Sequence, residues 1–190
     1  YDDIPNLSFK TGGLVVHNER LHPSGDLDWI PYPDFSLLKA DVPGRTKLSS
    51  IPVQTSRGCP FDCSFCSVTG MFGKQYRFRS TENIIEELRR YNDRKISIFF
   101  YDDNFAANRQ RAKALLEAMI RERFKFTWTT QVRADVARDP ELVRLMKKAG
   151  CHTLYIGFES LNPESLEGMK KNQTVAEIAH AVKVLRQNRI

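Results

Sequence analysis

Short apolar segments alternate with amphipathic segments from residue 51 onward, and this alternation limits the fold more than any other feature. The apolar segments are 51–56, 96–101, 126–132 and 153–158. A stretch with hydrophobic residues at helical spacing follows each of them. Strands that alternate with helices predict a parallel sheet with right-handed crossovers. Four strand–helix units are too few to close an eight-stranded barrel, so we expect an α/β fold, a partial (β/α) barrel with about four parallel units.

Capping residues predict where three of the helices begin. Ser80 is suited to cap the helix after the first strand, and Asp139 precedes Pro140, which is favoured at a first helical position. Thr174 and Glu177 have the spacing of a capping box.

The first two strands carry signals of their own. Pro52 cannot donate a ladder hydrogen bond, which predicts that the first strand begins at Val53. The segment 96–101 is nearly all apolar, as is typical of a strand covered on both faces. Between the first strand and Ser80 we expect a long loop rich in glycine and aromatic residues.

Residues 1–46 do not show the strand–helix alternation of residues 47–190, and we treat these ranges as two parts. Gly12-Gly13 lies between two short apolar segments and predicts a hairpin. A proline-rich stretch follows, which predicts an extended linker packed on a neighbouring surface, with one helical turn near 34–38. Its prolines are Pro23, Pro31, Pro33 and Pro43.

Cys59, Cys63 and Cys66 fall within eight residues, in the spacing C-x3-C-x2-C. A structural zinc site normally has four ligands, whereas three ligands suit a metal centre that keeps one position open. Thiolates favour iron–sulfur clusters, zinc or Cu(I). The segment 59–66, which we call the cysteine loop, is therefore a candidate metal centre with a vacant coordination position.

Other interpretations of the cysteines remain open at this point. Zinc with a distant fourth ligand is one of them, the candidate ligands being Cys151, His17, His22, His152 and His180. Disulfides are disfavoured, because no secretory leader pattern precedes the cysteines and we expect reduced thiols in the cytoplasm. Cys151 precedes the fourth strand, which predicts a buried core thiol at the opposite rim from the loop.

The charge balance permits an anionic partner without requiring one. The net charge is +6, from 29 Lys and Arg against 23 Asp and Glu. The basic residues lie mostly in amphipathic helices, where a solvated face is the ordinary interpretation. No apolar run approaches the ~20 residues that a membrane span needs. We therefore favour a small-molecule substrate over nucleic acid.

Polar residues recur at the end of each predicted strand, where parallel β/α folds bind ligands. Besides the cysteines these are Asp102, Asp103, Asn104, Gln131, Arg133 and Glu159. Each has a structural alternative. Asp103 or Asn104 can cap the next helix, and Glu159 can cap the turn near residue 162. Arg133 can form a surface ion pair with Asp135.

The cysteine loop, with Phe65 just before its third cysteine, resembles that of the radical S-adenosylmethionine (SAM) superfamily. Residues from about 50 to 190 resemble the first four βα units of its catalytic core. The resemblance implies that Cys59, Cys63 and Cys66 ligate a [4Fe–4S] cluster and that SAM chelates the fourth iron.

The same resemblance implies roles for the residues at the strand ends. Asp102, Asp103 and Asn104 stand where family members contact the SAM amino group, with Gln131 close by, and Arg133 is placed to meet the SAM carboxylate. Phe65 supports adenine. Gly157-Phe158-Glu159-Ser160 resembles a motif of the methylthiotransferase and cobalamin-dependent branch, and its Glu159 is expected near the SAM ribose or amino acid moiety.

The implied function is reductive cleavage of SAM to a 5′-deoxyadenosyl radical. That radical abstracts hydrogen in a methyltransferase, cyclase or related reaction. An external one-electron reductant is required, and no residue is assigned as a general acid or base. The Asp-Asp-Asn stretch departs from the Gly-Gly-Glu of many family members.

We expect the sequence to be a fragment that lacks the later strands of the barrel and is inactive alone. Residues 1–46 are similar to the tail that follows a cobalamin-binding domain, which implies cobalamin in the full-length protein. Two further hypotheses are an iron–sulfur electron carrier with four protein ligands and a zinc-stabilised RNA-binding module.

Overall fold

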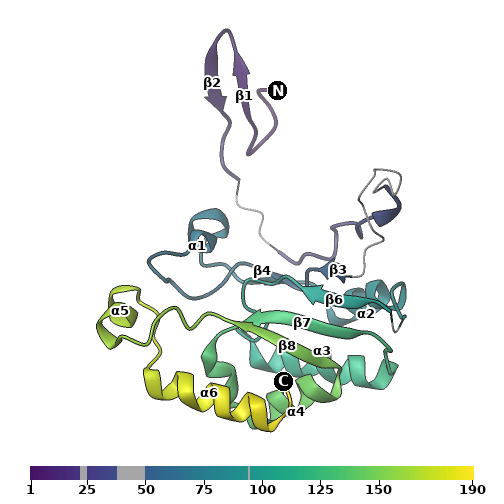
Figure 1. Ribbon diagram of the computed structural model, residues 1–190. Helices are drawn as coiled ribbons and strands as arrows, with labels where there is room; N and C mark the ends of the chain where they lie inside the picture. Colours follow the sequence, from purple (N-terminus) through teal and green to yellow (C-terminus); the bar gives the residue numbers. More distant parts are fainter. Residues whose placement is uncertain (22–24, 38–49, 94) are drawn as a thin grey trace, which may run out of the picture.

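A four-stranded parallel sheet forms the centre of the computed structural model, which describes residues 1–21, 25–37, 50–93 and 95–190 (Figure 1). The strands are β3 (Ser50–Val53), β6 (Ser97–Phe100), β7 (Thr127–Val132) and β8 (Cys151–Ile156). They pair in the order β3-β6-β7-β8, each parallel to the next. Each new strand is added on the same side, as in a barrel and unlike a doubly wound sheet. The predicted partial barrel of four parallel units is confirmed.

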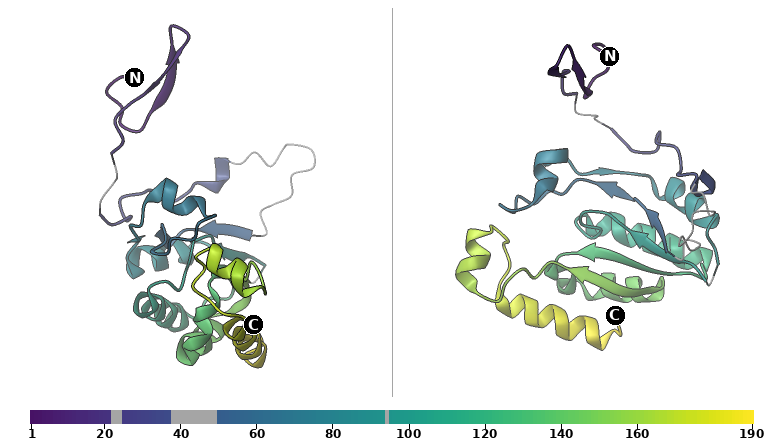
Figure 2. Two further views of the ribbon diagram at one scale, coloured as in Figure 1. Left: turned by 90° about the vertical axis from the view of Figure 1, so that its left-hand side faces the viewer. Right: turned by 45° about the horizontal axis from the view of Figure 1, so that its top comes forward.

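Helices cover one face of this sheet (Figures 1 and 2). They are α2 (Thr81–Arg89), α3 (Arg109–Glu122), α4 (Pro140–Lys148) and α6 (Val175–Gln187). Along β6 the side chains that face them, Ile98 and Phe100, are fully buried. Ser97 and Phe99, on the other face, are half-buried. The prediction that 96–101 is covered on both faces therefore holds for one face.

The core lies between the sheet and the helices. Phe100 of β6, Phe105 and Trp128 of β7 pack with ring centroids 5.4 to 5.6 Å apart. All three rings are fully buried, and the indole Nε1 of Trp128 donates to the Ala149 carbonyl at 2.8 Å. No helix of the described residues is long and apolar enough to cross a membrane.

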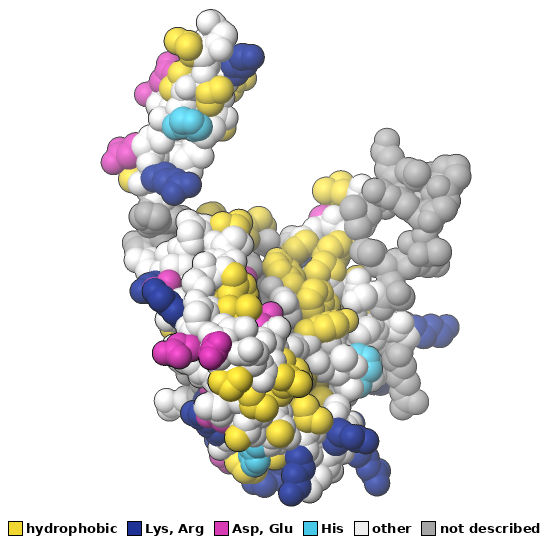
Figure 3. Space-filling view, turned by 60° about the vertical axis from the view of Figure 1, so that its left-hand side comes forward, with side chains coloured by type: hydrophobic (Ala, Val, Ile, Leu, Met, Phe, Trp, Pro, Cys, Tyr) yellow, Lys and Arg dark blue, Asp and Glu magenta, His cyan; other side chains and the backbone are white. Residues whose placement is uncertain are grey.

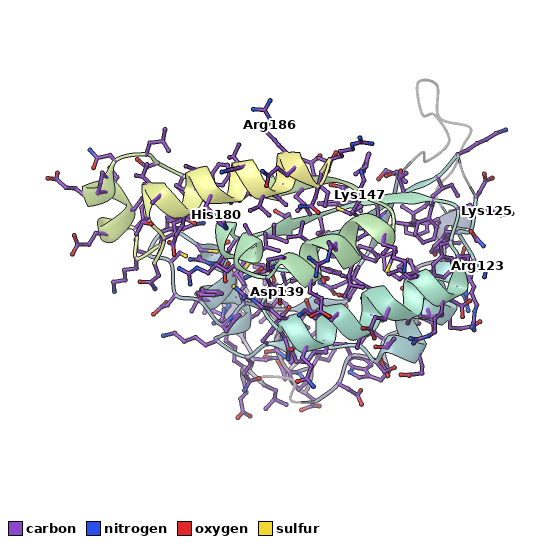
Figure 4. The ribbon with its side chains drawn as sticks, turned by 90° about the horizontal axis from the view of Figure 1, so that it is seen from below. Arg123, Lys125, Asp139, Lys147, His180 and Arg186 are labelled. Carbon is purple, nitrogen blue, oxygen red and sulfur yellow. The ribbon has the colours of Figure 1, made fainter. Side chains whose placement is uncertain are left out.

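The predicted helix starts are confirmed. The Ser80 side chain accepts from the Asn83 amide, and the Asp139 carboxylate accepts from the Leu142 amide. Thr174 and Glu177 make both hydrogen bonds of a capping box. Seen from below, α3, α4 and α6 lie side by side, and Lys147 of α4 reaches toward the end of α6 (Figure 4). Its Nζ donates to the Arg189 carbonyl at 2.5 Å.

The first strand differs from the prediction. Pro52 lies within β3, which is tolerated because β3 is at the edge of the described sheet. The chain then leaves this sheet, and β4 (Ser56–Arg57) pairs with β5 (Arg77–Phe78). A short helix, α1 (Ser67–Phe72), occupies part of the predicted loop. The short elements η2 (Ala134–Arg138) and α5 (Pro163–Gly168) were not predicted, and β8 begins at Cys151 rather than residue 153.

The N-terminal part contains the predicted hairpin, β1 (Ser8–Thr11) and β2 (Leu14–His17), whose two turn glycines have positive φ. It projects from the rest of the molecule (Figure 1). The predicted helical turn is η1 (Phe35–Leu37). Tyr32 packs on α2, where its hydroxyl donates to the Asn83 carbonyl at 3.1 Å. Residue 38, the 46/47 boundary, Pro23, Pro43 and His22 lie outside the described residues.

Candidate cofactor site at the strand tips

The carboxyl ends of the parallel strands meet the cysteine loop at one side of the molecule, together with α1 and α5 (Figures 1 and 2). Figure 3 turns this side toward the viewer and shows hydrophobic side chains gathered across it. Exposed apolar residues of this region include Phe65, Met71 and Leu161. A partly apolar surface with polar strand ends is the usual composition of a cofactor site.

Asp103, which follows β6, holds the start of the cysteine loop in place. The Gly58 amide donates to Asp103 Oδ2 at 3.0 Å. Gly58 has φ +88°, and a Cβ there would lie 2.2 Å from the Gln75 carbonyl oxygen. Glycine is therefore required at this turn for both its backbone conformation and its lack of a side chain.

Asp102 is fully buried, and its carboxylate points into the protein. It accepts from the Thr55 amide at 2.7 Å, from the Ser56 amide at 3.0 Å and from the Thr55 hydroxyl. Burial raises the pKa of this carboxyl, although the three hydrogen bonds oppose the shift. Asp102 thus joins the end of β6 to the segment that leads into the cysteine loop.

Asn104 and Gln131 lie near Asp102. Asn104 is 3% exposed, and its side-chain Oδ1 is buried with no hydrogen-bond partner among the described residues. Gln131 is exposed on β7 and its Nε2 donates to the Asp102 carbonyl at 3.4 Å. Neither Asp103 nor Asn104 caps the next helix, because the α3 cap is Asn108, so that structural alternative is wrong.

Arg133, at the end of β7, contacts the cysteine loop directly. Its Nη1 lies 3.5 Å from the Cys63 sulfur, and its guanidinium lies 4.1 Å from the centre of the Phe61 ring. Its Nη2 donates to the Lys171 carbonyl. Asp135 approaches Arg133 Nε at 4.0 Å, but Arg133 is 8% exposed, so this is not the surface ion pair of the alternative interpretation.

Glu159 follows β8 and is paired with Lys171. Its Oε1 accepts from Lys171 Nζ at 2.8 Å. The same ammonium lies 5.4 Å from the centre of the Phe65 ring, and Phe65 is itself 52% exposed. Asn162 caps α5, so Glu159 does not have the capping role of the alternative interpretation. Sequence reasoning missed Lys171, because its local sequence carries no signal that separates it from the many surface lysines.

The three thiols lie on one loop, where the Cys66 amide donates to the Cys63 carbonyl at 3.1 Å. In this conformation no group of three or more His, Cys, Asp or Glu side chains among the described residues is arranged to hold a metal ion. The donors themselves fit an iron–sulfur cluster: all three are free thiols that are half-buried or exposed, and the cationic Arg133 contacts one of them, Cys63. Burial raises the pKa of Cys59, while the Phe61 amide and Arg133 oppose the shift.

Cys151 is separated from this loop. It is the first residue of β8, at the opposite end of the strand from Glu159, and is 1% exposed. Burial raises its pKa to about 12. The prediction of a buried core thiol is confirmed.

Comparison with known proteins places the chain in a family. The model of the radical SAM superfamily matches residues 53–190. An uncharacterized methyltransferase of Pyrococcus horikoshii is 37% identical over 97% of this chain and 40% of its own length. The anaerobic magnesium-protoporphyrin IX monomethyl ester cyclase of Cereibacter sphaeroides is 34% identical over 97% of this chain and 31% of its own length.

A solved structure agrees in fold. The cobalamin-dependent S-adenosylmethionine radical enzyme OxsB matches all of this chain and 29% of its own, with a TM-score of 0.80 and 20% identity. The chain thus spans less than half the length of the proteins it matches. The predicted family is confirmed, and that family uses a [4Fe–4S] cluster and SAM. This chain belongs to the radical SAM superfamily.

Proposed function

We propose that this chain supplies the cluster-binding part of a radical SAM catalytic domain. Cys59, Cys63 and Cys66 would hold a [4Fe–4S] cluster as thiolates, which leaves SAM to complete its ligand set. When bound, the cluster would supply the one electron that splits SAM into methionine and a 5′-deoxyadenosyl radical. The observation that carries the proposal is the contact of Arg133 with Cys63, because it joins the cysteine loop to a strand end that offers a cation.

The chain's own residues bind and orient SAM in this proposal. Asp103, Asn104 and Gln131 offer oxygen acceptors to the SAM ammonium, and the unpartnered Oδ1 of Asn104 supports that assignment. Arg133 pairs with the carboxylate, since a guanidinium binds carboxylates in a fixed geometry. Glu159 accepts from the ribose, and Phe65 packs on adenine. Asp102 acts indirectly, by holding Thr55 and Ser56.

We infer that the complete enzyme transfers a methyl group to a small molecule or cyclises one. The methyltransferase and cyclase names of the relatives support this reaction class. Cobalamin as a second cofactor is supported by the likeness to the cobalamin-dependent branch. An external one-electron reductant and the reducing environment of the cytoplasm complete the proposal. No observation favours an electron carrier or an RNA-binding module.

Anaerobic reconstitution with iron and sulfide tests this function. We expect about four irons and four sulfides per chain, the stoichiometry of one [4Fe–4S] cluster. Serine at Cys59, Cys63 or Cys66 should abolish cluster binding, because each removes one thiolate ligand. The matched control is Cys151→Ser, which should keep the full iron content. A protein that binds zinc alone, or a cluster that is lost in the Cys151→Ser variant, would contradict the proposal.

A further inference from the structure

The loop after β8 is built around an ion pair. Lys171 keeps 7% of its side chain exposed and Glu159 keeps 31%, so the ammonium is the more deeply buried partner of their 2.8 Å contact. Glu159 has φ +62°, in the left-handed region that non-glycine residues rarely adopt. A buried lysine and a strained backbone both cost free energy, so this arrangement requires compensation from its surroundings.

Gly157 provides the space for the ion pair. A Cβ at Gly157 would lie 2.3 Å from Glu159 Oε1 and 2.8 Å from Lys171 Nζ. Gly157 is not among the residues with positive φ, so its backbone conformation does not require glycine. The ion pair that lies over Gly157 thus explains why this position is a glycine.

Lys171 also connects the loop to two other parts of the site. Its backbone carbonyl accepts from Arg133 Nη2, at the end of β7. Its ammonium lies 5.4 Å from the centre of the ring of Phe65, a residue of the cysteine loop. Two residues later, Gln173 Nε2 donates to the Phe158 carbonyl at 2.9 Å. Lys171 therefore contacts the β8 loop, the β7 tip and the cysteine loop at once.

We propose that Lys171 is a positioning residue of the cofactor site, which holds Glu159 and Phe65 in the orientation that binds SAM. This inference rests on the proposed function. Fixing one oxygen of the Glu159 carboxylate lowers the conformational freedom that the site loses when a ligand hydroxyl binds. Because Glu159 stays partly exposed, it can accept from that hydroxyl while it remains paired.

The test is the dissociation constant of SAM, measured by equilibrium dialysis on the reconstituted protein. Lys171→Met should weaken SAM binding about tenfold, the effect of losing one well-oriented charged contact, with iron content unchanged. Lys171→Arg, which keeps the charge, should bind within about threefold of the wild type. Lys170→Met is the matched control, because Lys170 is the exposed neighbour, and it should bind SAM normally.

Two further variants separate positioning from stability. Gly157→Ala keeps both charges but displaces the pair, so it should weaken SAM binding as Lys171→Met does, and it decides the question if Lys171→Met does not fold. Glu159→Gln combined with Lys171→Met should weaken SAM binding by clearly less than the product of the two single losses, because both variants break the Glu159–Lys171 contact.

Wild-type SAM affinity in both Lys171→Met and Gly157→Ala, with lower stability alone, would overturn the proposal. So would independent, multiplying losses in the double variant. A wild-type protein that takes up no cluster would instead overturn the proposed function.

Discussion

Asp102 and Asp103 are adjacent in sequence but have opposite surroundings. The Asp102 carboxylate is buried against Thr55 and Ser56, while Asp103 reaches the Gly58 amide at the edge of the site. Sequence reasoning found both, because they follow an apolar strand. It could not tell which one points inward, since that depends on how β3 ends and the chain turns toward β4.

Replacing Asp102 tests its structural role. Asp102→Ala should lower the free energy of unfolding by about 2–4 kcal/mol, because buried donors of Thr55 and Ser56 lose their acceptor. Asp102→Asn should cost less than about 1 kcal/mol, since an amide oxygen can accept from both backbone amides. Urea unfolding measures both variants. Equal losses in the two would show that the hydrogen bonds are not what Asp102 contributes.

Lys171 could not be predicted from the sequence. The cysteines were predicted because their spacing is itself the signal, and Arg133 because it ends a strand. Lys171 lies twelve residues after Glu159, beyond a short helix that has no clear periodicity. Its contact with Glu159 arises when α5 turns the chain back, and a local pattern cannot encode that return.

At the scale of elements, α4 is joined to α3 by its own N-cap. Figure 4 shows Asp139 at the start of α4, beside α3. One carboxylate oxygen accepts from the Leu142 amide at 3.0 Å and the other lies 2.9 Å from Lys113 Nζ on α3. The sequence predicted the cap from Asp139-Pro140, but the contact with α3 depends on helix packing.

We expect Asp139→Ala to lower the free energy of unfolding by about 1–2 kcal/mol, the usual cost of losing a helix cap. Asp139→Asn should cost less than about 1 kcal/mol, because asparagine also caps helices and the partly exposed ion pair contributes little. Thermal or urea unfolding distinguishes them. If asparagine were as costly as alanine, the ion pair with Lys113 would be the main contribution instead.

Helices with clear capping residues were predicted well, and short elements without such signals were missed. Helices α2, α4 and α6 have the N-caps that the sequence predicted, Ser80, Asp139 and Thr174. The start of β3 was misplaced because the rule against proline depends on whether a strand lies at an edge, which is a property of the sheet. The short helices α1 and α5 have too few residues to show a helical period.

At the scale of the whole molecule, the sequential strand order brings every strand end to one side. The cysteine loop, Asp103, Arg133 and Glu159 consequently share a region although they are spread over a hundred residues. This arrangement was predictable from the alternation of strands and helices. The exposure of the sheet face opposite these helices was not predictable: Tyr155 on β8 is 56% exposed, and the centre of its ring lies 6.0 Å from the centre of the Phe99 ring. Strand hydrophobicity alone does not indicate what covers such a face.

The most direct test of a three-thiol site is the electron paramagnetic resonance spectrum of the reduced, reconstituted protein with and without SAM. If three cysteines leave one iron for SAM, the addition of SAM should change the g values of the cluster signal, because the ligands of that iron change. A fully loaded cluster whose spectrum is identical at saturating SAM would contradict the account, since SAM would then not be a ligand of the cluster.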